Sequence, residues 1–377
     1  MVKLINFTEV NPISRKVDLS IKKEMYSTIL KKKFILGIEV KNFEDSFSKL
    51  SKIKYSVGCA SGTDALILAI KSLNLQKDDE IIIPAMTYIS TSLAVILNNF
   101  KIIFADIDEE TGLVSIAKIH KLITKKTKAI IPVNLYGQKV DIKKLRKVVG
   151  KKIFIIEDSA QSHFAYSCYN CRKNTNRKCC KKERNEKFAN IACYSFYPSK
   201  NLGAYGDAGL VATNNFKIYK KLLLLRNLGS VKKNKHNIIG MNSRLDTIQA
   251  VVLKNKLKSI LKLNDIRRKI SIFYDYHLGN IKEIKITDTK PGSSRHLYVI
   301  RTKNRNKLIK HLLFKKIHCQ IHYPYSLNKA KFIDRRITLK NSENWANQCL
   351  SLPLHPNLKI FQMKRIVSEI KNFFQHK

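Results

Sequence analysis

One lysine, Lys200, lies between a hydroxyl-rich turn and a glycine-rich loop. Upstream, the acidic pair Glu157 and Asp158 closes an apolar run that resembles a strand. A lysine, a carboxylate at a strand end and small hydroxyl residues are the groups that a pyridoxal phosphate site needs. The lysine forms the Schiff base, and the carboxylate keeps the pyridine nitrogen protonated. The ordinary alternative is that Lys200 is one basic residue among the 72 lysines and arginines of the chain.

A second group of residues could bind a phosphate. Ser61, Gly62 and Thr63 follow an apolar run and open a helix-like stretch, and backbone amides at the start of a helix bind anions. Most sequences of this kind are plain helix N-caps. In a chain that also carries Lys200, we predict that these residues hold the phosphate of the cofactor, together with Ser195.

Asp158 and Tyr88 each have an ordinary and a functional interpretation. Asp158 could be a solvated acid at a strand end, or a carboxylate covered by the cofactor ring and paired with its pyridinium nitrogen. Tyr88 starts a helix after a strand, where it could be a core aromatic or a flat platform stacked on the ring. Taken alone, Tyr88 is better interpreted as a core aromatic, and both interpretations of Asp158 stay open at this point.

Four cysteines lie in a basic insert, residues 167–187. Cys168, Cys171, Cys179 and Cys180 have the spacing C-x2-C-x7-C-C, and four thiolates could bind zinc. Adjacent Cys179 and Cys180 are awkward as ligands of one ion, and no paired histidines accompany them. We therefore expect a basic loop and no metal site.

The composition is that of a globular and very basic protein. The chain has 377 residues, 44% of them hydrophobic, and no apolar run of the roughly 18 residues that a membrane helix needs. The N-terminal residues are too poor in apolar types for a secretory signal, so we expect a cytoplasmic protein. Five cysteines in apolar or aromatic surroundings agree with reduced thiols: Cys59, Cys168, Cys193, Cys319 and Cys349.

The formal net charge of +44 has three interpretations. Nucleic-acid binding would use such a field, but the lysines are spread over the whole chain and are not interleaved with aromatic residues. A coding bias that decorates an enzyme surface is the interpretation we favour. An anionic substrate, such as a nucleotide diphosphate, is compatible with either.

Short apolar runs alternate with helix-like stretches between residues 57 and 215. This alternation predicts βαβ units and an α/β fold with a mostly parallel sheet. Ligands of such sheets bind beyond the carboxyl ends of the strands, where Asp158 falls. The expected strands are residues 81–83, 101–107, 129–135, 152–157 and 210–213, and the expected helices 63–73, 90–97, 116–123 and 142–149.

A long helical pattern over residues 245–263 indicates a connection into a second, smaller domain. We expect a large cofactor-binding domain over residues 1–245 and a small α+β domain over residues 246–377. The small domain should contain strands at 297–301 and 319–322 and a final helix at 361–374.

Nine motifs in order resemble those of the sugar-nucleotide aminotransferase family often called DegT. The resemblance covers about residues 5 to 375. The motifs are Ser61-Gly62-Thr63-Asp64-Ala65-Leu66, residues 84–91, Pro132-Val133-Asn134-Leu135-Tyr136-Gly137-Gln138, and residues 157–163, 195–207, 225–230, 242–246, 321–324 and 351–354.

The resemblance implies fold type I of the pyridoxal phosphate enzymes and a homodimer with shared active sites. It also assigns roles to single positions. By this resemblance Lys200 matches the Schiff-base lysine, Asp158 the pyridinium partner, Gln161 the residue near the ring hydroxyl, Gly62, Thr63 and Ser195 the phosphate ligands, Tyr88 the stacking aromatic, and Asn242 a phosphate ligand from the neighbouring subunit.

The activity implied by the resemblance is transamination of a nucleotide-linked ketosugar (dTDP-, UDP- or GDP-linked), with glutamate as the amino donor. The context of Tyr88 favours amination at carbon 3. Relatives with histidine at the lysine position are dehydratases, an alternative that Lys200 disfavours. A non-catalytic cofactor-binding regulator, or a protein associated with nucleic acid, would explain the charge. Substrate choice is put in doubt by two departures from the family pattern, Phe164 and the insert at 167–187, and the motif at 321–324 also continues atypically over residues 325–328.

Overall fold

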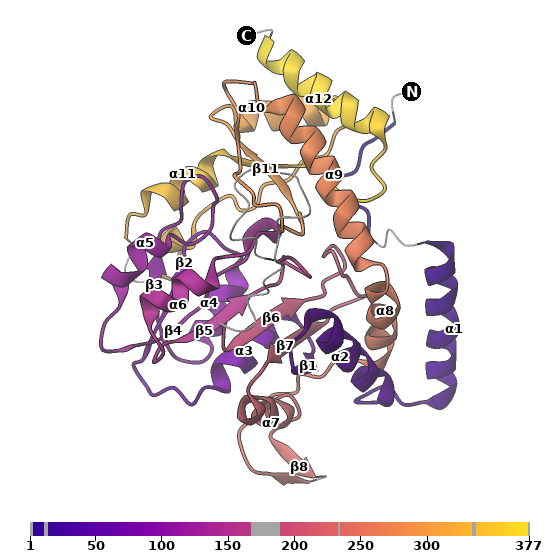
Figure 1. Ribbon diagram of the computed structural model, residues 1–377, viewed down its shortest axis with the longest axis vertical. Coiled ribbons are helices and arrows are strands. Elements are labelled where there is room, and N and C mark those ends of the chain that lie inside the picture. The colour runs from indigo at the N-terminus through magenta and orange to yellow at the C-terminus, as the bar shows by residue number, and fades with distance from the viewer. Residues whose placement is uncertain (1–2, 11–13, 167–188, 233, 334–336, 376–377) are drawn as a thin grey trace.

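The computed structural model describes residues 3–10, 14–166, 189–232, 234–333 and 337–375. Its largest element is a seven-stranded sheet (Figure 1). The strands from β6 to β3 run parallel, whereas β7 is antiparallel to both of its neighbours. In sheet order the strands are β1 (Tyr55–Cys59), β7 (Gly209–Thr213), β6 (Ile191–Ser195), β5 (Phe154–Asp158), β4 (Thr127–Ile130), β2 (Glu80–Pro84) and β3 (Lys101–Ala105).

Helices cover both faces of this sheet, which explains why its strands are nearly continuous apolar runs. Ile81 and Ile83 pack toward α3, α4 and α7, whereas Ile82 packs toward α5 and α6, and α2 and α8 extend that second layer. The helices are α2 (Ile38–Ser51), α3 (Gly62–Lys71), α4 (Ile89–Ile96), α5 (Ile116–Ile119), α6 (Ile142–Val149), α7 (Phe216–Leu225) and α8 (Thr247–Leu257).

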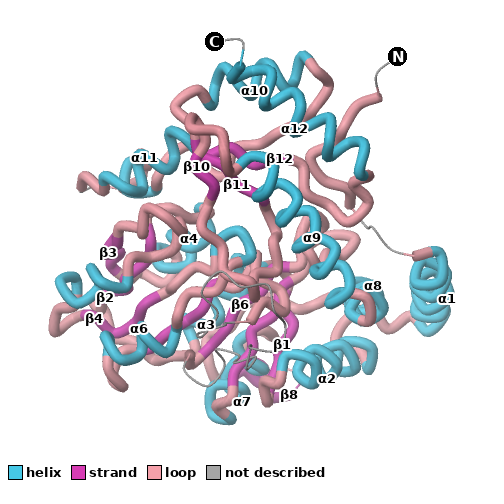
Figure 2. Tube along the Cα trace, turned by 45° about the horizontal axis from the view of Figure 1, so that its top comes forward, coloured by secondary structure: helices cyan, strands magenta, loops and turns pink. Residues whose placement is uncertain are grey.

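The C-terminal part forms a second layer of structure above the large sheet (Figure 2). A three-stranded antiparallel sheet, β10-β11-β12, packs with three helices around its own apolar cluster. Ile5 from the N-terminal segment also joins that cluster. The elements are α9 (Ile260–Leu278), β10 (Lys285–Ile286), β11 (Tyr298–Arg301), α10 (Arg305–Phe314), α11 (Lys340–Gln348), β12 (Cys349–Leu352) and α12 (Ile360–Gln375).

The predicted α/β class with a mostly parallel sheet is confirmed, but two predicted elements are wrong. The single helix expected over 245–263 is two helices, α8 and α9, separated by Lys258 and Ser259. The strand expected at 319–322 is reduced to one bridge between Gln320 and Ser351. The division into domains at residue 246 stays a prediction, and the cysteines expected in a loop at 167–187 lie outside the described residues.

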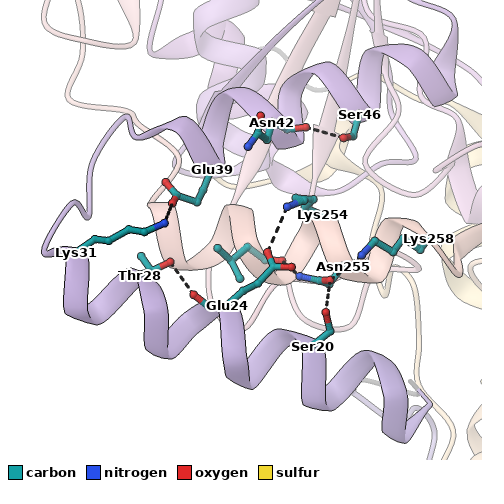
Figure 3. A network of polar contacts seen from close by, with 11 residues as sticks. Ser20, Glu24, Thr28, Lys31, Glu39, Asn42, Ser46, Lys254, Asn255 and Lys258 are labelled. Carbon is teal, nitrogen blue, oxygen red and sulfur yellow. Dashed lines mark hydrogen bonds and ion pairs between the residues drawn. The ribbon is translucent and has the colours of Figure 1, made fainter.

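The first helix, α1 (Arg15–Lys31), is attached to the body through α8 (Figure 3). Lys254 pairs with Glu24 at 3.3 Å, and the Ser20 hydroxyl donates to the Asn255 side-chain oxygen at 3.0 Å. Away from these contacts the helix exposes large apolar side chains, among them Tyr26, with 65% of its surface exposed. Such a face is typical of a surface that another chain covers.

Two further properties concern the part of the chain that the structure describes. None of its helices is long and apolar enough to cross a membrane. Its four cysteines are free, and no cluster of histidine, cysteine and acidic side chains in it could hold a metal ion.

Candidate active site

A cavity of about 760 Å³ opens beyond the carboxyl ends of the parallel strands, beneath the C-terminal part. The loops after β1, β2, β5 and β6 contribute residues to it, and so does the segment that precedes β11. Of the eight predicted site residues, seven line this cavity. They are Gly62, Thr63, Tyr88, Asp158, Gln161, Ser195 and Lys200.

Asp158 ends β5 and is 6% exposed. The Thr91 hydroxyl donates to Oδ2 at 2.9 Å, and the backbone N–H of Ala160 donates to Oδ1 at 3.1 Å. Burial raises the pKa of Asp158, and the two hydrogen bonds and the charge of Lys200 oppose that shift. A carboxylate held in this way is stabilised further by a cation above it, which fits a pyridinium nitrogen.

Lys200 follows a tight turn after β6. Its backbone N–H donates to the Tyr197 carbonyl at 2.8 Å, and the turn closes against Gly203, where a Cβ would lie 2.3 Å from the Pro198 carbonyl oxygen. Burial lowers the pKa of the Lys200 amine to about 8, although Asp158 opposes the shift. The amine is therefore neutral, and nucleophilic, at a much lower pH than an ordinary lysine.

The predicted phosphate ligands meet at the start of α3. The Ser61 hydroxyl accepts from the backbone N–H of Asp64 at 3.1 Å and so caps the helix. A Cβ on Gly62 would lie 2.4 Å from the Cβ of Ser195, so only glycine lets the two segments approach. The first amides of this ten-residue helix thus lie beside two hydroxyl groups, those of Thr63 and Ser195, a donor set that suits a phosphate dianion.

Gln161 and Tyr88 lie along the rest of the cavity wall. Gln161 accepts from the backbone N–H of Tyr136 at 2.7 Å and donates to the Tyr323 hydroxyl at 2.9 Å, which fixes its amide. Tyr88, 54% exposed, has its ring centroid 5.6 Å from that of Tyr323. The exposed Tyr88 ring is free to stack on a flat ligand, as expected of a platform.

Asn242 is the predicted residue that this cavity does not contain. It is exposed and forms a bridge with Asn227, next to the hairpin of β8 (Ser230–Lys232) and β9 (Lys235–His236). Its predicted action on a neighbouring subunit's cofactor stays a prediction.

Sequence reasoning gave no role to several C-terminal residues that line the cavity. Among them are His296, Gln320 and His322. His322 is 2.9 Å from the Ser351 hydroxyl through Nδ1, and burial lowers its pKa to about 4. The motif at 321–324 was the available signal for His322, whereas nothing in the pattern around His296 indicated a cavity.

The described cavity wall holds few charges for so basic a chain. Lys200 is the one lysine or arginine among the lining residues, beside two acids, Asp158 and Asp207. Among these described residues, a phosphate is therefore held by amide and hydroxyl donors and not by arginine or lysine side chains.

Comparison with known proteins identifies the family. The family model described as the DegT/DnrJ/EryC1/StrS aminotransferase family matches residues 17–371. The chain belongs to this family. A UDP-N-acetyl-3-dehydro-alpha-D-glucosamine 3-aminotransferase of Acidithiobacillus ferrooxidans is 35% identical to this family member over 343 residues, which cover 90% of this chain and 89% of the relative.

Two solved structures of relatives have the same fold. DesV of Streptomyces venezuelae is 30% identical, with a TM-score of 0.90 and 99% of both chains covered. NtdA of Bacillus subtilis, solved with bound cofactor PMP, is 26% identical, with a TM-score of 0.89; the match covers 100% of this chain and 86% of NtdA. These comparisons confirm the predicted family, fold class and reaction class of this DegT-family chain.

Proposed function

We propose that this DegT-family aminotransferase uses pyridoxal 5'-phosphate to aminate carbon 3 of a nucleotide-linked ketosugar, with glutamate as amino donor. The observation that carries the proposal is one cavity with Lys200, Asp158 and the start of α3 on its wall. The printed names of relatives, such as the UDP-sugar 3-aminotransferase of Acidithiobacillus ferrooxidans, support the sugar and the carbon.

The cofactor supplies an electron sink when bound. Lys200 would hold it covalently through its amine and, once released, the neutral amine would take up and return the substrate's proton as base and acid. Asp158 keeps the pyridine nitrogen protonated. The α3 amides, with Thr63 and Ser195, hold the phosphate, and Tyr88 and Gln161 orient the ring.

Borohydride trapping tests the assignment of Lys200. Reduction of the cofactor-loaded protein should fix the cofactor to the chain, and Lys200→Ala should lose that adduct. Lys256→Ala is the matched control, because Lys256 is also buried with a pKa lowered to about 8 but does not line the cavity. An adduct that persists in Lys200→Ala would contradict the assignment.

A half-reaction screen tests the substrate. The amine-loaded enzyme is mixed with UDP-, dTDP- and GDP-linked sugars that carry a ketone at carbon 3 or carbon 4, and return of the cofactor spectrum is followed. We expect turnover of a carbon 3 ketone. Turnover of carbon 4 ketones alone would move the proposed site of amination to carbon 4. The absence of turnover on every sugar tested would reject the proposal. The amino donor is tested by mixing the aldehyde-loaded enzyme with glutamate, which should convert the enzyme back to its amine-loaded form.

We further propose a cytoplasmic homodimer with shared sites. The exposed apolar face of α1 supports an interface, and the exposed position of Asn242, outside the cavity of its own chain, supports shared sites. A regulator or nucleic-acid-associated protein without turnover would instead show salt-sensitive DNA binding and no reaction with glutamate.

A further inference from the structure

His296 is a cavity residue whose two ring nitrogens have different environments. Nδ1 lies 3.1 Å from the Asn201 side-chain oxygen. The Asn201 amide nitrogen donates to Asn264 Oδ1 and to the Ser294 carbonyl, both at 2.8 Å. Since a carbonyl only accepts, the Asn201 amide orientation is fixed, and its oxygen must accept from Nδ1–H. The neutral ring then carries its lone pair on Nε2.

The backbone of His296 is held as firmly as its ring. Its N–H donates to the Tyr136 carbonyl at 3.0 Å, and the Arg267 guanidinium donates to its carbonyl at 3.3 Å. A Cβ on Gly137 would lie 2.6 Å from the His296 nitrogen, so the two backbones touch. The imidazole therefore has one fixed position on the wall.

The network behind the ring joins the half-buried Asn201 to the buried Asn264 and reaches the reacting lysine. Asn264, 1% exposed, donates to the His163 carbonyl at 2.9 Å, and Asn201 directly follows Lys200 in the chain. Burial and the charge of Lys200 hold the pKa of His296 well below its usual range, so the ring stays neutral at physiological pH.

A neutral nitrogen lone pair on the cavity wall needs a hydrogen-bond donor as its partner. The ionised phosphates and carboxylates of the ligands only accept, whereas the hydroxyl groups of a sugar donate. We propose that His296 is a specificity-determining residue whose Nε2 accepts a hydrogen bond from a hydroxyl group of the ketosugar. Asn201 and Asn264 are positioning residues that fix the tautomer. The inference rests on the proposed function.

Two substitutions of His296 separate the loss of the Nε2 acceptor from the loss of the contact with Asn201. In His296→Asn the side-chain amide can still donate to Asn201 but does not reach the place of Nε2, whereas His296→Gln can put a carbonyl oxygen there. With His296→Asn we expect kcat/KM for the ketosugar to fall about 10- to 100-fold, the usual effect of a lost hydrogen bond in a site built for it. The glutamate half-reaction should fall far less, and His296→Gln should recover part of the loss.

A deoxy sugar gives the decisive comparison. The wild-type enzyme should lose a similar factor on a ketosugar that lacks the bound hydroxyl group, and His296→Asn should no longer distinguish the two sugars. A set of deoxy analogues of the accepted sugar, each lacking one hydroxyl group, identifies the hydroxyl group that His296 binds. Should His296→Asn not retain cofactor, His296→Gln is compared on the same sugars.

The tautomer is tested by pH. Asn201→Asp offers only acceptors, so it stabilises a protonated His296, and a new loss of ketosugar turnover should appear toward low pH. Equal slowing of both half-reactions by His296→Asn, with sugar discrimination kept, would overturn the inference. A wild-type enzyme that aminates no ketosugar would overturn the proposed function, and this inference with it.

Discussion

At the scale of single residues, the shifted pKa of Lys200 has a kinetic consequence. Only the neutral amine attacks the cofactor aldehyde, and burial lowers the pKa of this amine to about 8. Below that pH the protonated form dominates, so the rate of cofactor attachment to the apoenzyme should fall about tenfold per pH unit, and above it the rate should level off. Stopped-flow absorbance against pH measures the midpoint.

Asp158→Asn is the control for that midpoint. The charge of Asp158 raises the pKa of Lys200 against the effect of burial. Without that charge, the midpoint should move to lower pH. A midpoint near 10, or one that does not respond to Asp158→Asn, would contradict the account of the Lys200 environment.

The reacting groups were predictable from sequence because their chemistry follows from residue type. Lys200 and Asp158 stand out by their order and their neighbours, and the structure places both on one cavity wall. The tautomer of His296 was not predictable in the same way, because it depends on a contact with Asn201, whose amide is in turn oriented by Asn264. Those residues are 95 and 32 positions away (296 − 201 and 296 − 264), and no local pattern joins them.

At the scale of elements, the close approach of α3 to β6 can be tested at Gly62. In Gly62→Ala the new methyl group would overlap Ser195, with 2.4 Å between the two Cβ atoms, so the start of the helix must move. We expect a cost of about 1–3 kcal/mol. Because the phosphate ligands move with the helix, cofactor affinity should fall roughly 5- to 150-fold. Equilibrium titration of the apoenzyme measures it.

Gly206→Ala is the matched substitution. Its nearest neighbour is the end of the flexible Gln249 side chain, 3.0 Å from the new Cβ, which can move aside. Affinity should change by less than about threefold, within the ±0.5 kcal/mol usual away from sensitive sites. Equal losses in the two variants would mean that the contact between Gly62 and Ser195 does not position the phosphate ligands.

Element type was predictable where apolar periodicity is strong, whereas a break inside a continuous apolar pattern was not. The helix expected at 142–149 is α6 with the same bounds, because its buried apolar residues, Ile142, Leu145 and Val149, recur at helical spacing on one face. The break between α8 and α9 is invisible to periodicity. There Ser259 N–H bonds to the carbonyl of Lys256, three residues back, and a helix resumes with its apolar pattern in place.

At the scale of the whole molecule, the position of Asn242 makes a prediction about subunit exchange. Asn242 is exposed and outside its own chain's cavity, so the proposal requires that it act on a neighbouring subunit. Lys200→Ala and Asn242→Ala should each be nearly inactive alone. In a mixed dimer both defects fall in one site and leave the other site intact. Unfolded and refolded together, the two variants should recover about a quarter of wild-type activity.

The control for subunit exchange mixes Lys200→Ala with Asp158→Asn. Both residues line the cavity of their own chain, so every site in that mixed dimer keeps one defect and no activity should return. Recovery with Asn242→Ala but not with Asp158→Asn assigns Asn242 to the partner's cofactor. If neither mixture recovers activity, although size measurements show mixed dimers, Asn242 serves its own chain or none, and the shared site is rejected.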